Sequence, residues 1–255
     1  MIGQGRQTPI SKSPLIMVHG LLGPLHVLNV DRHFRGREVL CPDLLGYSAR
    51  PLPPSLSLDA QAEEVARLIR GLGRRCHLLG HSVGGAVVMW AAHKAPECVQ
   101  SLITVEGNFT LDDAFMCRRI APLPAKEWAR QWQLTQQDAA AWLTQAGIAV
   151  TEDRLRMARI ILGHQSAETV QAMARAVVHE TANPRYLKII HQVLDGGTPL
   201  HLLAGERSAK GWHVPPWVRA YAHSDRVMPG CGHMMMLEDP ARFCEILSEI
   251  LAGSD

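Results

Sequence analysis

Residues 78–85 read Leu-Leu-Gly-His-Ser-Val-Gly-Gly, and the apolar run Ala86–Ala92 follows at once. An apolar strand that enters a Gly-x-Ser-x-Gly turn and leaves it as a helix is typical of a nucleophile elbow, which holds one hydroxyl on a sharp bend. Gly80 and Gly84 fit this bend because a Cβ would collide where backbone segments approach closely. The stretch therefore predicts Ser82 as a nucleophile, which needs a histidine base, a carboxylate and oxyanion donors elsewhere in the chain.

The composition is that of an ordinary globular protein with one sizeable core: 255 residues, 47% hydrophobic and 20% charged. A net charge of +2 with interspersed signs predicts neither nucleic acid nor an anionic membrane as a partner, which leaves a small hydrophobic molecule. The sequence shows no signal-peptide pattern and no apolar run long enough to span a bilayer. We therefore expect a cytoplasmic protein, a monomer or a homodimer, without a cofactor.

The six cysteines are scattered along the chain without any C-x-x-C pair, a pattern that favours buried thiols over disulfides or zinc ligands. Cys231 and His233 are two residues apart but have no partners at metal-ligand spacing. We therefore expect no bound metal.

Short apolar runs alternate with a helical pattern in the first part of the chain. The runs lie at residues 15–18, 39–41, 76–79 and 101–106, and apolar residues recur at helical spacing between Ser57 and Gly71. Such alternation predicts a mostly parallel sheet of about six strands flanked by helices, with ligands beyond the carboxyl ends of the strands. His19, Ser82 and Glu106 all fall at such ends.

The next ninety or so residues read as helices without a convincing strand, too long a stretch for a loop in a compact domain. Helical patterns cover residues 127–143, 152–162, 168–178 and 186–194. We expect residues 108–197 to form a helical cap inserted in a core made of residues 1–107 and 198–255. The core resumes with strands near 199–204 and 226–228, and with a last helix capped by Asp239.

Four motifs stand in one order along the chain: His19-Gly20, the Asp-x-x-Gly-x-Ser-x-x-Pro stretch at 43–51, the elbow, and Gly-His-x-x-x-x-Glu-Asp-Pro at 232–240. In this order they resemble the α/β-hydrolase superfamily, in its serine-nucleophile branch with a helical cap. Members of that superfamily usually begin with an antiparallel strand pair. Only 14 residues precede the first clear strand here, so we expect this first hairpin to be short or missing.

The resemblance implies roles for residues in three of these motifs. Ser82 would be the nucleophile, and His233, in the late loop after the last strand, would be the general base. The backbone N–H groups of Leu21 and Val83 would form the oxyanion hole, with Leu22 as the alternative if the loop is shifted by one residue.

The acid departs from the usual pattern. Relatives usually place it after the penultimate strand, three residues beyond a glycine, where this chain has Ser208. Some relatives carry it instead at the end of the strand that follows the elbow, where Glu106 stands. A carboxylate at the inner end of an apolar strand needs a partner such as a histidine. We therefore favour Glu106 over the alternative, Glu206.

Apolar and adaptable side chains in the expected cap suit a hydrophobic substrate. The candidate substrate-binding residues are Leu22, His81, Phe109, Trp128, Trp132 and Met234. A serine in place of an aspartate at the elbow argues against epoxide hydrolysis and dehalogenation. The sequence therefore predicts hydrolysis of a small to medium hydrophobic carboxylic ester, thioester or lactone. Acyl transfer and carbon–carbon bond hydrolysis remain open, as does a catalytically slow ligand-binding receptor, because the usual acid position is altered.

Overall fold

The computed structural model describes residues 12–255, and within them six strands form one sheet in the order β2-β1-β3-β4-β5-β6. Every neighbouring pair in the sheet is parallel. The strands are β1 (Leu15–Val18), β2 (Val39–Leu40), β3 (Cys76–His81), β4 (Val99–Val105), β5 (Leu200–Gly205) and β6 (Ala222–Met228). The predicted parallel sheet is confirmed. The expected short or missing first hairpin falls mainly on residues 1–11, which lie outside the described residues.

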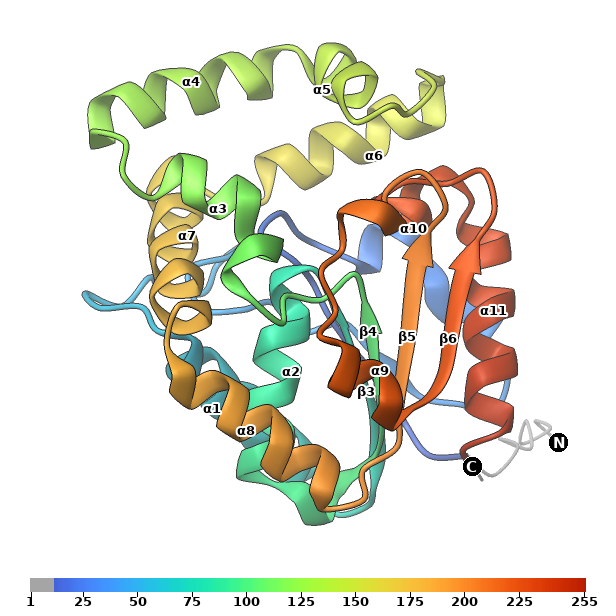
Figure 1. Cartoon of the computed structure of the whole chain (residues 1–255). Coiled ribbons are helices and arrows are strands. Elements are labelled where there is room, and N and C mark those ends of the chain that lie inside the picture. Colours follow the sequence, from blue (N-terminus) through green and yellow to red (C-terminus); the bar gives the residue numbers. More distant parts are fainter. Residues whose placement is uncertain (1–11) are drawn as a thin grey trace, which may run out of the picture.

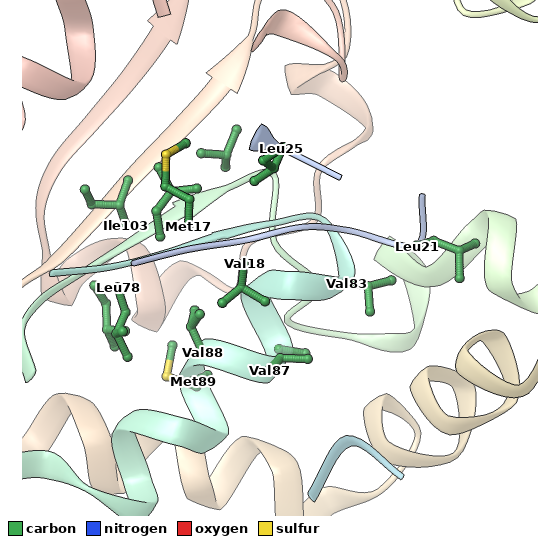
Figure 2. Packing of buried hydrophobic residues seen from close by; sticks show 14 of the residues in the cluster. Met17, Val18, Leu21, Leu25, Leu78, Val83, Val87, Val88, Met89 and Ile103 are labelled. Atoms are coloured by element: carbon green, nitrogen blue, oxygen red, sulfur yellow. The ribbon is translucent and has the colours of Figure 1, made fainter. Parts of the chain in front are cut away.

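The central strands are covered on both faces, which explains their continuous apolar sequence. All four residues of β1 and all six of β3 are buried. Side chains alternate between the two faces of a strand, and Figure 2 shows Val18 and Leu78 on the side of Val87 and Val88, with Met17 and Ile103 on the opposite side.

Helices form the two outer layers of the core (Figure 1). Helix α2 (Val83–Lys94) packs against α1 (Leu58–Gly71) and α8 (Pro184–Asp195), while α11 (Pro240–Ala252) lies beside β5 and β6. The expected start of α1 is confirmed, since the Ser57 side chain accepts a hydrogen bond from the Ala60 N–H. Asp239 caps α11 in the same way through the Arg242 N–H.

The connection between β4 and β5 is helical, and α4, α5 and α6 lie over the end of the sheet toward which the strands point (Figure 1). The three helices over the sheet are α4 (Ala125–Gln137), α5 (Ala139–Gln145) and α6 (Glu152–Gly163). The other helices of this connection are α3 (Phe115–Ile120), α7 (Ala167–Thr181) and α8. Because α8 packs on α2 in the core layer, the division into a core and a cap at residues 108–197 stays a prediction.

One expected helix, at residues 127–143, is two helices. The chain leaves helical geometry at Asp138. The Asp138 side chain accepts a hydrogen bond from the Ala141 N–H and so caps the start of α5. The remaining short elements are α9 (Pro216–Tyr221), α10 (Met235–Glu238) and the 3-10 turns His26–Leu28, Val30–His33, Pro96–Cys98, Leu111–Ala114 and Ala209–Gly211.

The turn between β3 and α2 depends on two close backbone approaches. A Cβ at Gly80 would lie 2.3 Å from the carbonyl oxygen of Gly84, and a Cβ at Gly84 would lie 2.4 Å from the carbonyl oxygen of Val18. The atoms in the way are backbone atoms of the central strands and of the first turn of α2, which cannot move aside without disturbing the sheet.

We expect Gly80→Ala to lower the free energy of unfolding by about 3 kcal/mol or more, because the added methyl group overpacks rigid backbone. Gly71→Ala is the matched control, since nothing lies within 4 Å of a Cβ added at the end of α1. That variant should be neutral or more stable by up to about 1 kcal/mol. Urea unfolding of both variants measures the difference, and equal stabilities would contradict the steric argument.

Candidate active site

Ser82 stands at the apex of the turn between β3 and α2 with φ at 53° and ψ at −121°. A serine in such a conformation costs about 1–3 kcal/mol, so its surroundings must hold it there. Three backbone hydrogen bonds do so: its N–H donates to the carbonyl of Val105 at 2.9 Å, and its carbonyl accepts from the N–H groups of Gly85 (2.9 Å) and Asn108 (3.1 Å). The turn is therefore tied to the end of β4 and to the segment beyond it.

His233 and Glu106 form a close pair at the carboxyl end of the sheet. Glu106 follows β4, His233 lies in the loop after β6, and the distance from His233 Nδ1 to Glu106 Oε2 is 2.6 Å. A carboxylate can only accept, so Nδ1 carries the proton. In the neutral ring this assignment leaves Nε2 unprotonated and able to accept a proton.

The second oxygen of Glu106 is also occupied. Oε1 accepts hydrogen bonds from the N–H of Gly205 at 2.8 Å and from the Ser208 hydroxyl. Burial alone would raise the pKa of Glu106, but the hydrogen bond and charge of His233, together with the donors at Ser208 and Gly205, lower it below its usual value. The side chain of Glu106 is 5% exposed and is held as an anion.

Glu206, the alternative acid, lies elsewhere. Its side chain is exposed and accepts a hydrogen bond from the N–H of Gly230 at 2.7 Å. Among the hydrogen bonds of residues 12–255, the carboxylate on the His233 ring is that of Glu106. The geometry therefore favours Glu106, and its catalytic role stays a prediction.

His81 connects the elbow to the loop that carries His233. Its Nε2–H donates to the carbonyl of His233 at 3.0 Å, and the two ring centroids are 4.7 Å apart. Burial, reinforced by the nearby His233, lowers the pKa of His81 to about 3. His81 is therefore neutral, and its hydrogen bond holds the loop that carries His233 beside the elbow.

No hydrogen bond between the Ser82 hydroxyl and the His233 ring is present within the described residues. Such bonds are often long in structures without a substrate and shorten only in the complex. The arrangement consequently has a paired histidine and carboxylate beside the elbow.

The loop His19–Gly23 lies directly on the elbow. A Cβ at Gly20 would be 3.1 Å from the Cβ of Ser82. Within the part of the chain that the structure describes, the N–H groups of Leu21, Leu22 and Val83 donate to no acceptor. Unpaired N–H groups beside a nucleophile are what an oxyanion hole requires, so both the expected Leu21 and its alternative, Leu22, remain available.

Three candidate substrate-binding residues line one cavity of about 500 Å³, namely Leu22, Trp128 and Trp132. Trp128 and Trp132 also pack on each other, with ring centroids 5.7 Å apart. Phe109 is buried and stacks on Trp212, while Met234 is half-buried directly after His233. The cavity also includes Trp142 and Ile120, which were not among the candidates, and the polar side chains of Arg118, Arg119 and Gln131.

Sequence reasoning did not assign a role to Ser208 or Gln165. Ser208 donates to Glu106, and the side chain of Gln165 accepts from the N–H of Gly23 in the loop beside the elbow. The signal for Ser208 was its position, since it stands where relatives carry the acid. We find no comparable sequence signal for Gln165.

Two features are absent from residues 12–255. No group of three or more His, Cys, Asp or Glu side chains is arranged to hold a metal ion. No helix among these residues is long and apolar enough to cross a membrane.

Comparison with known proteins supplies the family. Residues 15–246 match the model of the Alpha/beta hydrolase family. The chain belongs to the alpha/beta hydrolase family. A solved structure of MenH from S. aureus shares the fold of this hydrolase, with a TM-score of 0.72 at 17% identity over 99% of this chain and 97% of that one. A thermophilic esterase from Thermogutta terrifontis has a TM-score of 0.67 at 19% identity over 95% and 90% of the two chains.

Proteins related in sequence are of two kinds. Some match most of the chain at lower identity, and others match a shorter part of it at higher identity. The hydrolase is 28% identical over 221 residues to the pimeloyl-[acyl-carrier protein] methyl ester esterase of Yersinia pestis bv. Antiqua (strain Angola), covering 84% of this chain and 76% of that one. It is 31% identical over 103 residues to Lipase 1 of Psychrobacter immobilis, covering 38% and 32%. The chain thus aligns with about a third of the length of that lipase.

The buried histidines predict a pH dependence of stability. Burial lowers the pKa of His19 to about 4 and that of His81 to about 3, whereas both titrate near 6.5 in the unfolded chain. Below pH 6.5 the unfolded state therefore binds more protons, so stability falls as the pH drops, by about 1.4 kcal/mol per pH unit for each ring. We expect each ring to lower the free energy of unfolding by roughly 2 kcal/mol between pH 7 and pH 5.

Urea unfolding at both pH values measures this drop. His19→Asn should reduce the drop by roughly 2 kcal/mol, whatever its effect on stability at pH 7. His179→Gln, at an exposed position on α7, should retain the whole drop. A drop that is the same in the wild type and His19→Asn would contradict the assignment of a neutral buried ring.

Proposed function

We propose that this hydrolase cleaves a small to medium hydrophobic carboxylic ester, thioester or lactone through an acyl-enzyme on Ser82. The observation that supports this most directly is the 2.6 Å hydrogen bond between His233 Nδ1 and Glu106 Oε2, beside the elbow. It orients the ring and stabilises the imidazolium that forms when Nε2 takes a proton. Because it supplies a carboxylate although the usual acid position holds serine, it favours an enzyme over a slow ligand-binding receptor.

In the first half of the reaction, His233 Nε2 accepts the Ser82 proton while Oγ attacks the carbonyl carbon of the ester. The tetrahedral intermediate collapses to an acyl-enzyme, and the leaving alkoxide takes the proton from His233. Water then attacks the acyl-enzyme by the same route and releases the acid. The N–H groups of Val83 and of Leu21 or Leu22 would bind the oxyanion in both halves.

The hydrophobic substrate class rests on the cavity of about 500 Å³ that includes Leu22, next to the expected oxyanion donor, and the tryptophans of α4 and α5. The aromatic side chains of this lining suit an acyl chain or a ring, while Arg118, Arg119 and Gln131 make the rest of it polar. The names of the relatives, a methyl ester esterase and a lipase, point to esters as well. We also propose that the helices between α3 and α7 act as the cap over this cavity.

We expect Ser82→Ala to lower kcat by roughly a million-fold and Glu106→Gln by roughly ten thousand-fold, because a neutral amide cannot stabilise the imidazolium. Glu206→Gln is the matched control and should stay near the wild-type rate, since it changes an exposed carboxylate bound to Gly230. A panel of p-nitrophenyl esters, thioesters and lactones measures these rates. Loss of activity in Glu206→Gln, but not in Glu106→Gln, would overturn the assignment of the acid.

The same assay separates the competing reactions. A fluorophosphonate should label Ser82 in the wild type and not in Ser82→Ala. An added alcohol that diverts most of the acyl group from water would point to an acyltransferase, and saturable binding without turnover would point to a receptor. Either result would contradict the ester hydrolase.

Because Ser208 contacts Glu106, we expect that a carboxylate at position 208 can replace the one at position 106. In Glu106→Ala, a second change of Ser208→Asp should place a carboxylate at the usual position and restore activity by roughly 10- to 100-fold over Glu106→Ala alone, a part of what an acid contributes. Ser208→Asn in the same background has the same shape without the charge and should restore nothing. Equal rates in the two double variants would contradict a shared acid site.

A further inference from the structure

The loop His19–Gly23 offers the expected oxyanion donors, and three of its four peptide groups are each held by a hydrogen bond. His19 Nδ1 donates to the carbonyl of Gly20 at 2.9 Å, and the Tyr47 hydroxyl donates to the carbonyl of Leu21 at 2.9 Å. The N–H of Gly23 donates to Oε1 of Gln165 at 3.2 Å. Since a peptide group is planar, fixing one of its polar atoms fixes the direction of the other.

These three bonds account for three successive peptide planes. The bond to the Gly20 carbonyl orients the N–H of Leu21, and the bond to the Leu21 carbonyl orients the N–H of Leu22. The bond to Gln165 fixes the next plane, between Leu22 and Gly23. The two unpaired donors therefore point in directions that their neighbours set.

Of the three anchors, Gln165 is the one supplied by the helical insertion. It lies in the turn between α6 and α7, is 4% exposed, and uses both ends of its amide, because Nε2 donates to the carbonyl of Ile161 at 2.7 Å. Removing Oε1 would leave the N–H of Gly23 buried without an acceptor, which costs about 1–3 kcal/mol. The loop would shift to satisfy that group.

The same turn is fastened to the core by further bonds. The N–H of Ser48 donates to the carbonyl of His164 at 2.9 Å, and His164 Nε2 lies 2.7 Å from Asp43 Oδ1. Thr169 in α7 donates to the carbonyl of Gly46 at 2.8 Å. The turn between α6 and α7 is thus the place where the insertion is attached to the loops around the elbow.

We propose that Gln165 is a positioning residue for the oxyanion hole: by holding the peptide plane that follows Leu22, it lets the turn between α6 and α7 keep the loop with the Leu21 and Leu22 donors in place beside Ser82. The inference rests on the proposed function, because it requires an oxyanion at Ser82. It predicts that Gln165 contributes to stabilising the transition state and little to binding the substrate. A residue with only a structural role in the insertion would not show this division.

Gln165→Met tests the proposal, since methionine has nearly the same length without an acceptor for Gly23. Gln171→Met is the matched control: Gln171 is also a buried glutamine of the insertion, 4% exposed, but its amide donates to the carbonyls of Ile120 and Leu123. We expect Gln165→Met to lower kcat by about tenfold or more, less than the effect of deleting an oxyanion donor. KM should change by less than about threefold, since uniform binding is untouched.

The second readout is a trifluoromethyl ketone, which adds to a serine to form a tetrahedral oxyanion. Its affinity should fall by the same factor as kcat/KM in Gln165→Met and should stay near the wild-type value in Gln171→Met. Equal losses in the two variants, a loss confined to KM, or an unchanged inhibitor affinity would each overturn the proposal. Circular dichroism shows whether each variant folds.

If Gln165→Met does not fold, Gln165→Asn and Gln165→Glu answer the same question. Asparagine is one methylene too short to reach Gly23 and should show the loss in kcat, whereas glutamate keeps an acceptor for that N–H and should retain more of the rate. The reverse order would overturn the proposal. If the wild type hydrolyses no ester and Ser82 is not labelled by a fluorophosphonate, the proposed function fails and the inference with it. If the wild type passes both tests, a failure of the variants concerns the inference alone.

Discussion

Backbone segments approach so closely around the turn from β3 to α2 that only glycine fits at positions 80 and 84. This constraint determines where the functional groups lie. Ser82, with φ at 53°, and Glu106, with φ at 44°, both adopt left-handed backbone conformations that cost energy. The bonds from Ser82 to Val105 and from Asn108 to Ser82 join the two turns. Two strained residues are therefore held by one shared set of backbone contacts, and the central sheet compensates for their cost.

A buried carboxylate is unfavourable unless donors surround it. Glu106 has three: the ring of His233, the N–H of Gly205 and the hydroxyl of Ser208. Ser208 stands at the position where the resemblance places the acid, and its hydroxyl donates to the carboxylate that follows β4 instead. The loop after β5 thus still serves the acid, but as a donor. This explains how the chain can lack the usual aspartate and still present a paired histidine and carboxylate.

The sequence predicts the parts of this molecule that depend on local pattern. Buried strands appear as continuous apolar runs, and the caps at Ser57 and Asp239 mark helix starts that the structure confirms. It fails where a single polar residue overrides a pattern, as Asp138 does by dividing the expected helix at 127–143. It also found only the end of β6, because this edge strand is partly exposed along most of its length.

The same distinction applies to the candidate site: local sequence predicts some of its residues, and long-range contacts add others. The choice of Glu106 over Glu206 follows from a local argument, since a carboxylate at the inner end of an apolar strand needs a partner. The contact between Ser208 and Glu106 spans 102 residues and that between Gln165 and Gly23 spans 142. No periodicity or motif spacing reports contacts of that range, because the first arises when β5 pairs with β4 and the second when the insertion folds back onto the loop beside the elbow.

The residues proposed for the chemistry and the residues that line the cavity are held by different elements. Such a hydrolase can therefore change its substrate and keep its reaction. The turn with the proposed nucleophile and the proposed acid are fixed by the sheet, whereas the loop with the proposed oxyanion donors is held from both sides, by Tyr47 of the core and by Gln165 of the insertion. Helices α4 and α5 line the cavity but do not carry these anchors. Under the proposed function, changes to the cavity wall alter which acyl group fits, while changes at the turn between α6 and α7 act on the loop that carries the donors. On this proposal, specificity and transition-state stabilisation depend on different parts of the same insertion.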